Sequence, residues 1–124
     1  MNGRKAKARR RAEREHSDRY VAAMRAAVPQ LERTTPDGDH EVWQVGPATV
    51  LVPVVPTDAP TELQQAITVH RMAALTTDCP RCDNDVRVTL DGQVFTRHKA
   101  ACPGDPDRLV QLGERLGVEV TRRD

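Results

Sequence analysis

Three cysteines and one histidine, spaced as two close pairs, place the strongest constraint on the fold of this chain. Cys79 and Cys82 form a C-x2-C pair, and His98 and Cys102 form an H-x3-C pair. Each short turn directs two ligand atoms at one point, so two such pairs supply the four corners of a tetrahedron, as in structural zinc sites. We therefore predict that Cys79, Cys82, His98 and Cys102 bind one structural Zn2+ ion.

The segment between the two pairs is predicted to be a β-hairpin that brings them together. Residues 86–90 and 93–97 alternate in character, and Asp91–Gly92 between them is the preferred sequence for a two-residue type I′ turn. Pairing outward from that turn sets Asp85 opposite His98. The predicted register therefore returns His98 to the first cysteine pair, where a further ligand is needed.

A helix is expected after the last ligand. Asp105 is a favourable N-cap before Pro106, and Gly117 is a favourable stop, which predicts a helix from about Pro106 to Leu116. Residues 118–121 could add a short edge strand. The order of cysteine knuckle, hairpin, ligand turn and helix is that of treble-clef and related zinc folds, so we expect a treble-clef-like zinc module over residues 78–124.

Other interpretations of the cysteines explain less. Chance scatter or simple burial would leave the paired spacing without a cause, and a disulfide between Cys79 and Cys82 would leave Cys102 and His98 unexplained. Catalytic zinc keeps three protein ligands and an open position, whereas four ligands close the tetrahedron. The H-x-E motif of zinc deaminases is absent from the sequence.

Residues 78–104 also resemble a small zinc-finger segment found in proteins of GC-rich actinobacteria and their phages. The resemblance rests on Cys-Pro-Arg-Cys, on Val-Arg-Val-Thr-Leu-Asp-Gly and on Arg-His-Lys-Ala-Ala-Cys-Pro-Gly. It covers about a fifth of the chain and leaves residues 1–77 without a family. It implies structural zinc and a nucleic-acid role.

The N-terminal segment is predicted to be a basic helix. Residues 4–28 lack Gly and Pro and are rich in Ala, Arg and Glu, which favour helices. Residues 1–19 carry eight lysines and arginines against three acidic residues, although the whole chain has a net charge of only +1. The residues expected to contact nucleic acid are Arg4, Lys5, Lys7, Arg9, Arg10, Arg11 and Arg14.

The central segment is predicted to hold a hairpin and a helix. Residues 41–45 and 48–55 are rich in β-branched side chains and are joined at Gly46–Pro47. Pro53 should put the second strand at a sheet edge or give it a bulge there. A helix should follow, opened by a capping box over Thr61–Gln64 and ending near Thr77. His70 on its apolar face is interpreted as a half-buried packing residue.

These elements predict an α+β fold with three parts. The expected parts are a basic N-terminal helix (1–28), a hairpin-and-helix body (29–77) and a zinc module (78–124). The chain has 124 residues and only three aromatic residues, so its core must rely on aliphatic side chains. A core of that kind is expected to need additional stabilisation from a bound metal or a partner chain.

The function expected from the sequence is that of a binding module. The basic arm could neutralise phosphates of nucleic acid or of a ribonucleoprotein. The alternative is a protein-interaction adaptor of phage or mobile-element origin, in which the arm docks on an acidic protein partner without nucleic-acid contact. The oligomeric state stays open.

Enzymatic activity and membrane insertion are not expected. The sequence lacks a Gly-rich phosphate loop or nucleophile elbow, and the polar cluster at Asp37, Asp39, His40 and Glu41 is interpreted as a turn rather than as a metal or catalytic site. The longest apolar stretch is interrupted by Pro53 and is far too short to span a bilayer. No signal peptide is apparent, so we expect a cytoplasmic protein.

Overall fold

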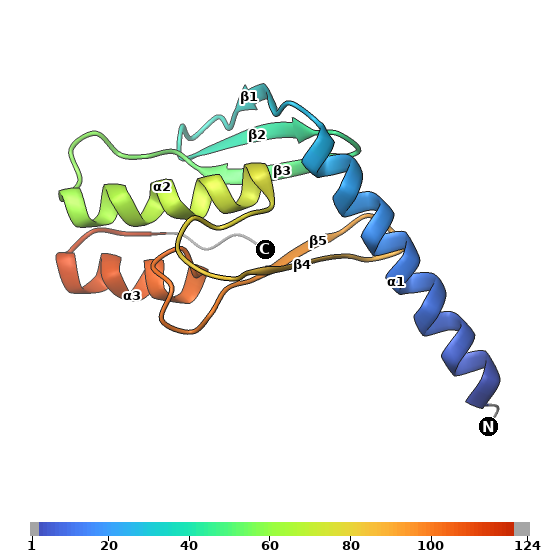
Figure 1. Ribbon diagram of the computed structural model, residues 1–124. Coiled ribbons are helices and arrows are strands. Elements are labelled where there is room, and N and C mark those ends of the chain that lie inside the picture. The colour runs from blue at the N-terminus through green and yellow to red at the C-terminus, as the bar shows by residue number, and fades with distance from the viewer. Residues whose placement is uncertain (1–2, 121–124) are drawn as a thin grey trace.

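The computed structural model describes residues 3–120 and has a mixed α+β architecture (Figure 1). Within that range the chain forms three helices and two small antiparallel sheets. The elements are α1 (Gly3–Ala26), β1 (Gln30–Thr34), β2 (His40–Val45), β3 (Ala48–Pro53), α2 (Thr61–Thr76), β4 (Asp85–Val88), β5 (Val94–Arg97) and α3 (Pro106–Leu116). None of the helices in this range combines the length and the apolar character needed to cross a membrane.

The first sheet has the strand order β1-β2-β3. The β2–β3 hairpin turns at Gly46–Pro47, with Val45 paired to Ala48, as predicted. The second strand lies at the sheet edge, as Pro53 indicated, but it ends at Pro53 and does not reach Val55. Strand β1 was not predicted; all of its residues are exposed, and it pairs with β2 through a bulge.

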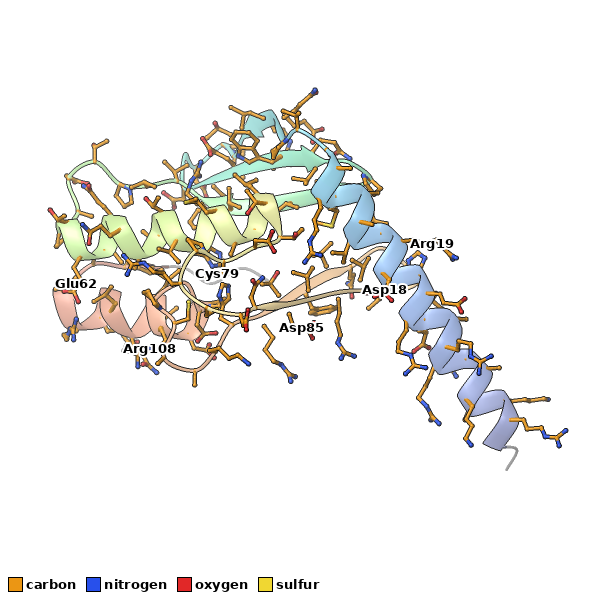
Figure 2. All side chains as sticks on the ribbon, in the orientation of Figure 1. Asp18, Arg19, Glu62, Cys79, Asp85 and Arg108 are labelled. Carbon is orange, nitrogen blue, oxygen red and sulfur yellow. The ribbon has the colours of Figure 1, made fainter. Side chains whose placement is uncertain are left out.

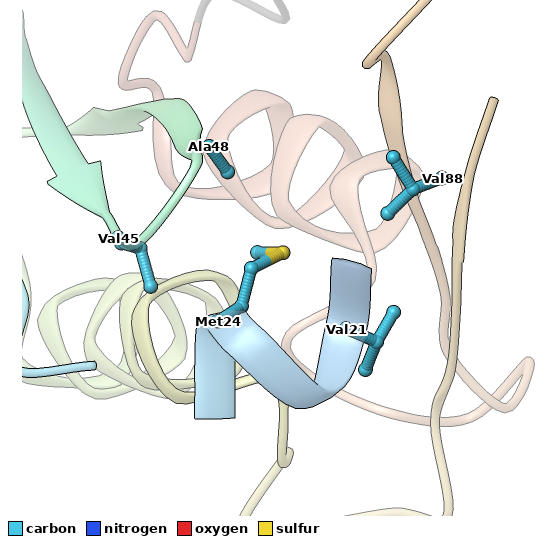
Figure 3. Packing of buried hydrophobic residues seen from close by; sticks show 5 residues of the cluster. All are labelled: Val21, Met24, Val45, Ala48 and Val88. Atoms are coloured by element: carbon cyan, nitrogen blue, oxygen red, sulfur yellow. The ribbon is translucent and has the colours of Figure 1, made fainter. Parts of the chain in front are cut away.

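Helix α1 crosses the ends of both sheets, and its first half extends away from the rest of the chain (Figure 1). It ends at Ala26, two residues before the predicted boundary at Val28. The buried residues of its second half belong to a cluster that draws on α1 and on both hairpins (Figure 3). That cluster consists of Val21, Met24, Val45, Ala48 and Val88.

Helix α2 lies along the first sheet and next to α3 (Figure 1). It ends at Thr76 with Thr77 in the left-handed region, close to the predicted end. The predicted capping box does not form: the helix begins at Thr61 without a side-chain cap, and the Gln64 amide donates instead to the carbonyls of Thr57 and Ala59. The carbonyl oxygens of the preceding loop attract the Gln64 amide away from the helix N-terminus.

An ion pair holds α2 on the sheet. A guanidinium N–H of Arg71 donates to the Glu41 carboxylate at 2.7 Å and to the Pro53 carbonyl at 2.8 Å. The indole N–H of Trp43 donates to the same carboxylate at 3.1 Å. Both charged side chains are four-fifths buried, so the hydrogen bonds, rather than exposure to water, compensate their charges.

Helix α3 has the predicted bounds, with Asp105 at the N-cap position and Gly117 as its left-handed C-cap. Its Leu109 joins a second buried cluster with residues of α2, and Val118 and Val120 pack against the same cluster. The predicted strand at 118–121 is therefore wrong for residues 118–120, whose apolar side chains are used in helix packing. Thr121 lies outside the described residues.

The β4–β5 hairpin is shifted by one residue from the predicted register. Asp85 pairs with Arg97 and Val88 pairs with Val94, so Asp85 is not opposite His98. A one-residue shift exchanges the two faces of a strand. In the observed register Val88 and Val94 belong to the cluster that α1 covers.

The shift arises because the turn contains three residues rather than two. The N–H of Thr89 donates to the carbonyl of Gln93 at 2.9 Å, and the N–H of Gly92 donates to the carbonyl of Thr89 at 3.0 Å. Gly92 has a φ of 90°, as expected at the last position of a three-residue hairpin loop. The hydroxyl of Thr89 contacts Asp91 and accepts the N–H of Gln93, which stabilises the longer loop.

Candidate metal centre

The four predicted ligands come together at one point of the structure. Cys79 and Cys82 lie in the loop after α2, whereas His98 and Cys102 follow β5, and the β4–β5 hairpin joins the two loops. All four ligand atoms lie within 4.8 Å of one another. No other group of three or more potential ligands of this kind occurs within residues 3–120. Figure 2 shows Cys79 beside α2, where the chain leaves that helix.

Three of the separations between ligand atoms are close to the edges of a tetrahedral metal site. The Sγ atoms of Cys79 and Cys102 are 3.5 Å apart, and Nδ1 of His98 is 3.5 Å from Sγ of Cys82 and 3.6 Å from Sγ of Cys102. Zinc–ligand bonds of about 2.3 Å to sulfur and about 2.0 Å to nitrogen give tetrahedral edges of roughly 3.8 Å and 3.5 Å. A disulfide would require about 2.05 Å between sulfurs, and all three cysteines are free.

Backbone N–H groups support a sulfur in each ligand loop. The N–H of Arg81 points to Sγ of Cys79 at 3.5 Å, and the N–H of Gly104 points to Sγ of Cys102 at 3.4 Å. In both loops the donor lies two residues after the cysteine. The repeated contact directs a positive dipole at each sulfur, which favours the thiolate form that binds metals.

Two side chains that the sequence did not single out brace the first loop. The Asn84 carbonyl oxygen accepts the N–H of Cys79 at 2.9 Å, and its amide donates to the carbonyl of Thr77 at 2.8 Å. Arg25 of α1 donates to the Thr77 hydroxyl at 2.8 Å and lies 3.5 Å from Asp78. An Asn two residues after a C-x2-C pair is the only local signal that could have indicated part of this arrangement.

His70 braces the second loop from α2. Its Nδ1 lies 2.9 Å from the carbonyl oxygen of Gly104, and its ring centroid is 6.4 Å from that of His98. Because a carbonyl can only accept, His70 carries its proton on Nδ1. Gly104 is tightly enclosed, since a Cβ there would lie 3.0 Å from Val69 and 3.3 Å from His98. His70 therefore positions the loop that presents Cys102.

The pKa shifts of Cys79 and His98 favour metal binding, whereas that of Cys102 opposes it in the absence of a cation. Burial alone would raise the pKa of Cys79, but hydrogen bonds from the Arg81 N–H and the neighbouring thiols lower it below its ordinary value. Burial, reinforced by the Cys79 sulfur, raises the pKa of Cys102 to about 12. Burial and His70 lower the pKa of His98, so its imidazole is neutral at pH 7. A divalent cation would supply the charge that lets the Cys102 thiol ionise.

The residues predicted to contact nucleic acid all lie in the first half of α1. Arg4, Lys5 and Lys7 are exposed, as are Arg9, Arg10, Arg11 and Arg14. One ion pair within this half joins Arg9 to Glu13 at 3.3 Å. The structure therefore places these side chains on an accessible surface away from the metal centre.

The side chains of the polar cluster at residues 37–41 do not converge on one point. Asp37 accepts the Thr35 hydroxyl and the N–H of Asp39, which closes the turn as predicted. Glu41 binds Arg71, and His40 is buried with no hydrogen-bond partner for its Nδ1. The side chains of this polar cluster therefore point to different parts of the structure.

Comparisons of this chain with protein-family models, with curated proteins and with solved structures gave no match.

Proposed function

We propose that Cys79, Cys82, His98 and Cys102 hold one structural zinc ion in a binding module that has no catalytic role. Three thiolates and an imidazole are a soft donor set that suits zinc rather than magnesium or calcium. Four protein ligands leave no position for a reacting water, unlike catalytic zinc. The order of knuckle, β4–β5 hairpin, ligand turn and α3 supports a treble-clef-like module.

We further propose that the module contacts nucleic acid, alone or in a ribonucleoprotein, through the first half of α1. The observation that carries this proposal is the projection of that half from the body (Figure 1). His16 contacts the body, with its Nε2 2.9 Å from the carbonyl oxygen of Thr89. Ser17 follows, accepting the N–H of Val88 at 2.9 Å. Lys7, Arg11 and Arg14, which precede His16, are exposed on this projecting half and accessible to a partner.

Four of these basic residues lie along one side of the helix. Arg4, Lys7, Arg11 and Arg14 alternate at spacings of three and four residues, which places them in one row. With a rise of about 1.5 Å per residue, the row extends over roughly 15 Å. A row of cations on this scale can follow several phosphates of one strand, with release of condensed counterions.

The basic residues of α1 lie at the N-terminal end of the helix, where the positive end of the helix dipole disfavours them. Its first turn contains no acidic residue, although the positive end of the dipole favours acids there. Cations at this end raise the free energy of the isolated helix. Phosphates bound at the same end would relieve that repulsion, which favours an anionic partner.

Binding of labelled nucleic acid to the zinc-loaded chain, measured by fluorescence anisotropy over a series of salt concentrations, tests the proposal. The double variant Arg11→Gln/Arg14→Gln should reduce the slope of log K against log[salt] by about 1.4 on single strands and about 1.8 on duplex. The control Arg33→Gln/Arg97→Gln removes the same charge from exposed sites outside α1 and should leave the slope unchanged.

Equal slopes for the two double variants would show that the arm does not contact phosphates. If the chain then bound an acidic protein partner through the same α1 residues, the adaptor role would replace the nucleic-acid role. Zinc measured by mass spectrometry in the wild type and in Cys79→Ser tests the metal separately: one zinc per chain, lost in the variant, is expected.

A further inference from the structure

A groove lies between α2 and α3 at the opposite end of the structure from the basic half of α1. Figure 2 shows Glu62 of α2 and Arg108 of α3 on the side of the structure away from Arg19 of α1. The groove has a volume of about 450 Å³. Ala66 and Leu112 give it an apolar lining, and the Gln65 and Gln111 amides lie along its two sides.

The cations of this groove are only partly balanced. Arg115 pairs with Glu62 at 2.7 Å. Within residues 3–120, Arg81 and Arg108 have no acidic partner, although both line the same groove. Two guanidinium groups without an acidic partner, in one groove with the Gln65 and Gln111 amides, favour an anion there. Arginine binds phosphate with two parallel N–H donors, which suits this arrangement.

The metal centre builds one end of the groove. Arg81 lies between the two cysteines of the first ligand pair, and its N–H contacts Sγ of Cys79. Pro103, which also lines the groove, directly follows Cys102. The position of the Arg81 backbone therefore depends on the fold of the ligand loops.

We propose that this groove binds a nucleotide unit of a single nucleic-acid strand, with a phosphate held by Arg81 and Arg108. The proposal rests on the proposed function, because it assigns a second contact for the same ligand. The volume lies in the range of sites that take one small-ligand-sized group and is too small for a duplex. The Gln65 and Gln111 amides can donate to and accept from a base edge, and Ala66 and Leu112 can cover its apolar surface. A single strand carries a phosphate on every unit, so a strand long enough to extend from the groove to α1 would contact both.

The test uses the full zinc-loaded chain with Arg11→Gln/Arg14→Gln already in place, so that arm contacts are reduced. Arg81→Gln and Arg108→Gln are added singly, and binding of a labelled 20-nucleotide single strand is followed over a salt series. Each should reduce the slope of log K against log[salt] by about 0.7, the value for one phosphate contact on a single strand. Arg33→Gln, at an exposed site on β1, should leave the slope unchanged. Zinc content and thermal midpoint should match the parent in all three.

Slopes for Arg81→Gln and Arg108→Gln equal to that of Arg33→Gln would overturn the groove proposal, whatever the arm does. A reduced slope in these two variants would support the groove proposal. If Arg11→Gln/Arg14→Gln alone also had the same slope as the wild type, the groove proposal would stand and the arm proposal would fail. Competition distinguishes the ligand. Unlabelled single strand should displace the labelled strand. Equal displacement by a duplex, a mononucleotide or poly-glutamate, at the same phosphate or carboxylate concentration, would contradict a single-strand site.

Discussion

Nδ1 of His70 lies 2.9 Å from the carbonyl oxygen of Gly104, so helix α2 directly holds the loop that presents the last cysteine of the metal centre. The same loop residue donates its N–H to Sγ of Cys102 at 3.4 Å. His70 thus helps to position Cys102, a candidate metal ligand, through the backbone of Gly104. Interactions of this outer kind orient ligands and raise metal affinity.

Replacement of His70 by Gln should weaken zinc binding by about tenfold, since loss of an outer partner of a metal site typically has an effect of this size or larger. Thr68→Ala on the exposed side of the same helix is the matched control and should leave affinity unchanged. Competition with a chromophoric chelator measures both. Equal affinities for the two variants would show that the His70–Gly104 hydrogen bond does not position Cys102.

Stability should decline as the pH falls below about 6.5. Burial lowers the pKa of both His70 and His98 in the folded chain. The unfolded chain therefore takes up protons first as the pH falls through the ordinary histidine value of about 6.5, and the folded state loses stability relative to it. Protons also compete with a bound metal for ligands, which acts in the same direction.

Thermal unfolding at pH 7.5 and pH 5.5 measures this effect. The midpoint of the wild type should be lower at pH 5.5, and His70→Gln should show a smaller decline because one of the two histidines no longer titrates. An increase of the midpoint on acidification would contradict the assigned direction of both pKa shifts.

The clustering of the four candidate metal ligands could be predicted from sequence because its signal is local and chemical. The spacing of Cys79, Cys82, His98 and Cys102 restricts the geometry whatever the rest of the chain does, and the structure brings the four together. The helices could be predicted for a similar reason, since residue propensities and the Pro and Gly positions mark their bounds.

The features that were missed depend on contacts rather than on local pattern. Strand β1 has no buried residue and therefore no apolar alternation; it exists through backbone pairing with β2. The Asp91–Gly92 pair favours a two-residue turn, but the Thr89 side chain stabilises a three-residue loop. The bond between His70 and Gly104 joins residues 34 positions apart, which no spacing rule predicts.

Loss of one metal ligand should unfold the module rather than only empty the site. In Cys102→Ser we expect loss of zinc, rapid amide exchange across residues 79–116 and a thermal midpoint lower by about 10 °C or more, because metal binding supplies much of the folding free energy of small zinc modules. Ala101→Ser, a similar substitution at an exposed neighbour, is the control. Native exchange and full zinc content in Cys102→Ser would contradict the ligand assignment.

Two glycine substitutions should separate backbone strain from the packing of α1 on the first sheet. Gly46 has a φ of 58°, and a Cβ there would lie 2.9 Å from the carbonyl oxygen of Ala23 in α1. Gly38 has a φ of 77° but no atom within 4 Å of such a Cβ. Gly38→Ala should therefore cost only the left-handed strain of about 1–2 kcal/mol, whereas Gly46→Ala should cost about 3 kcal/mol or more in urea unfolding. Equal losses would show that the β2–β3 turn does not pack closely against α1.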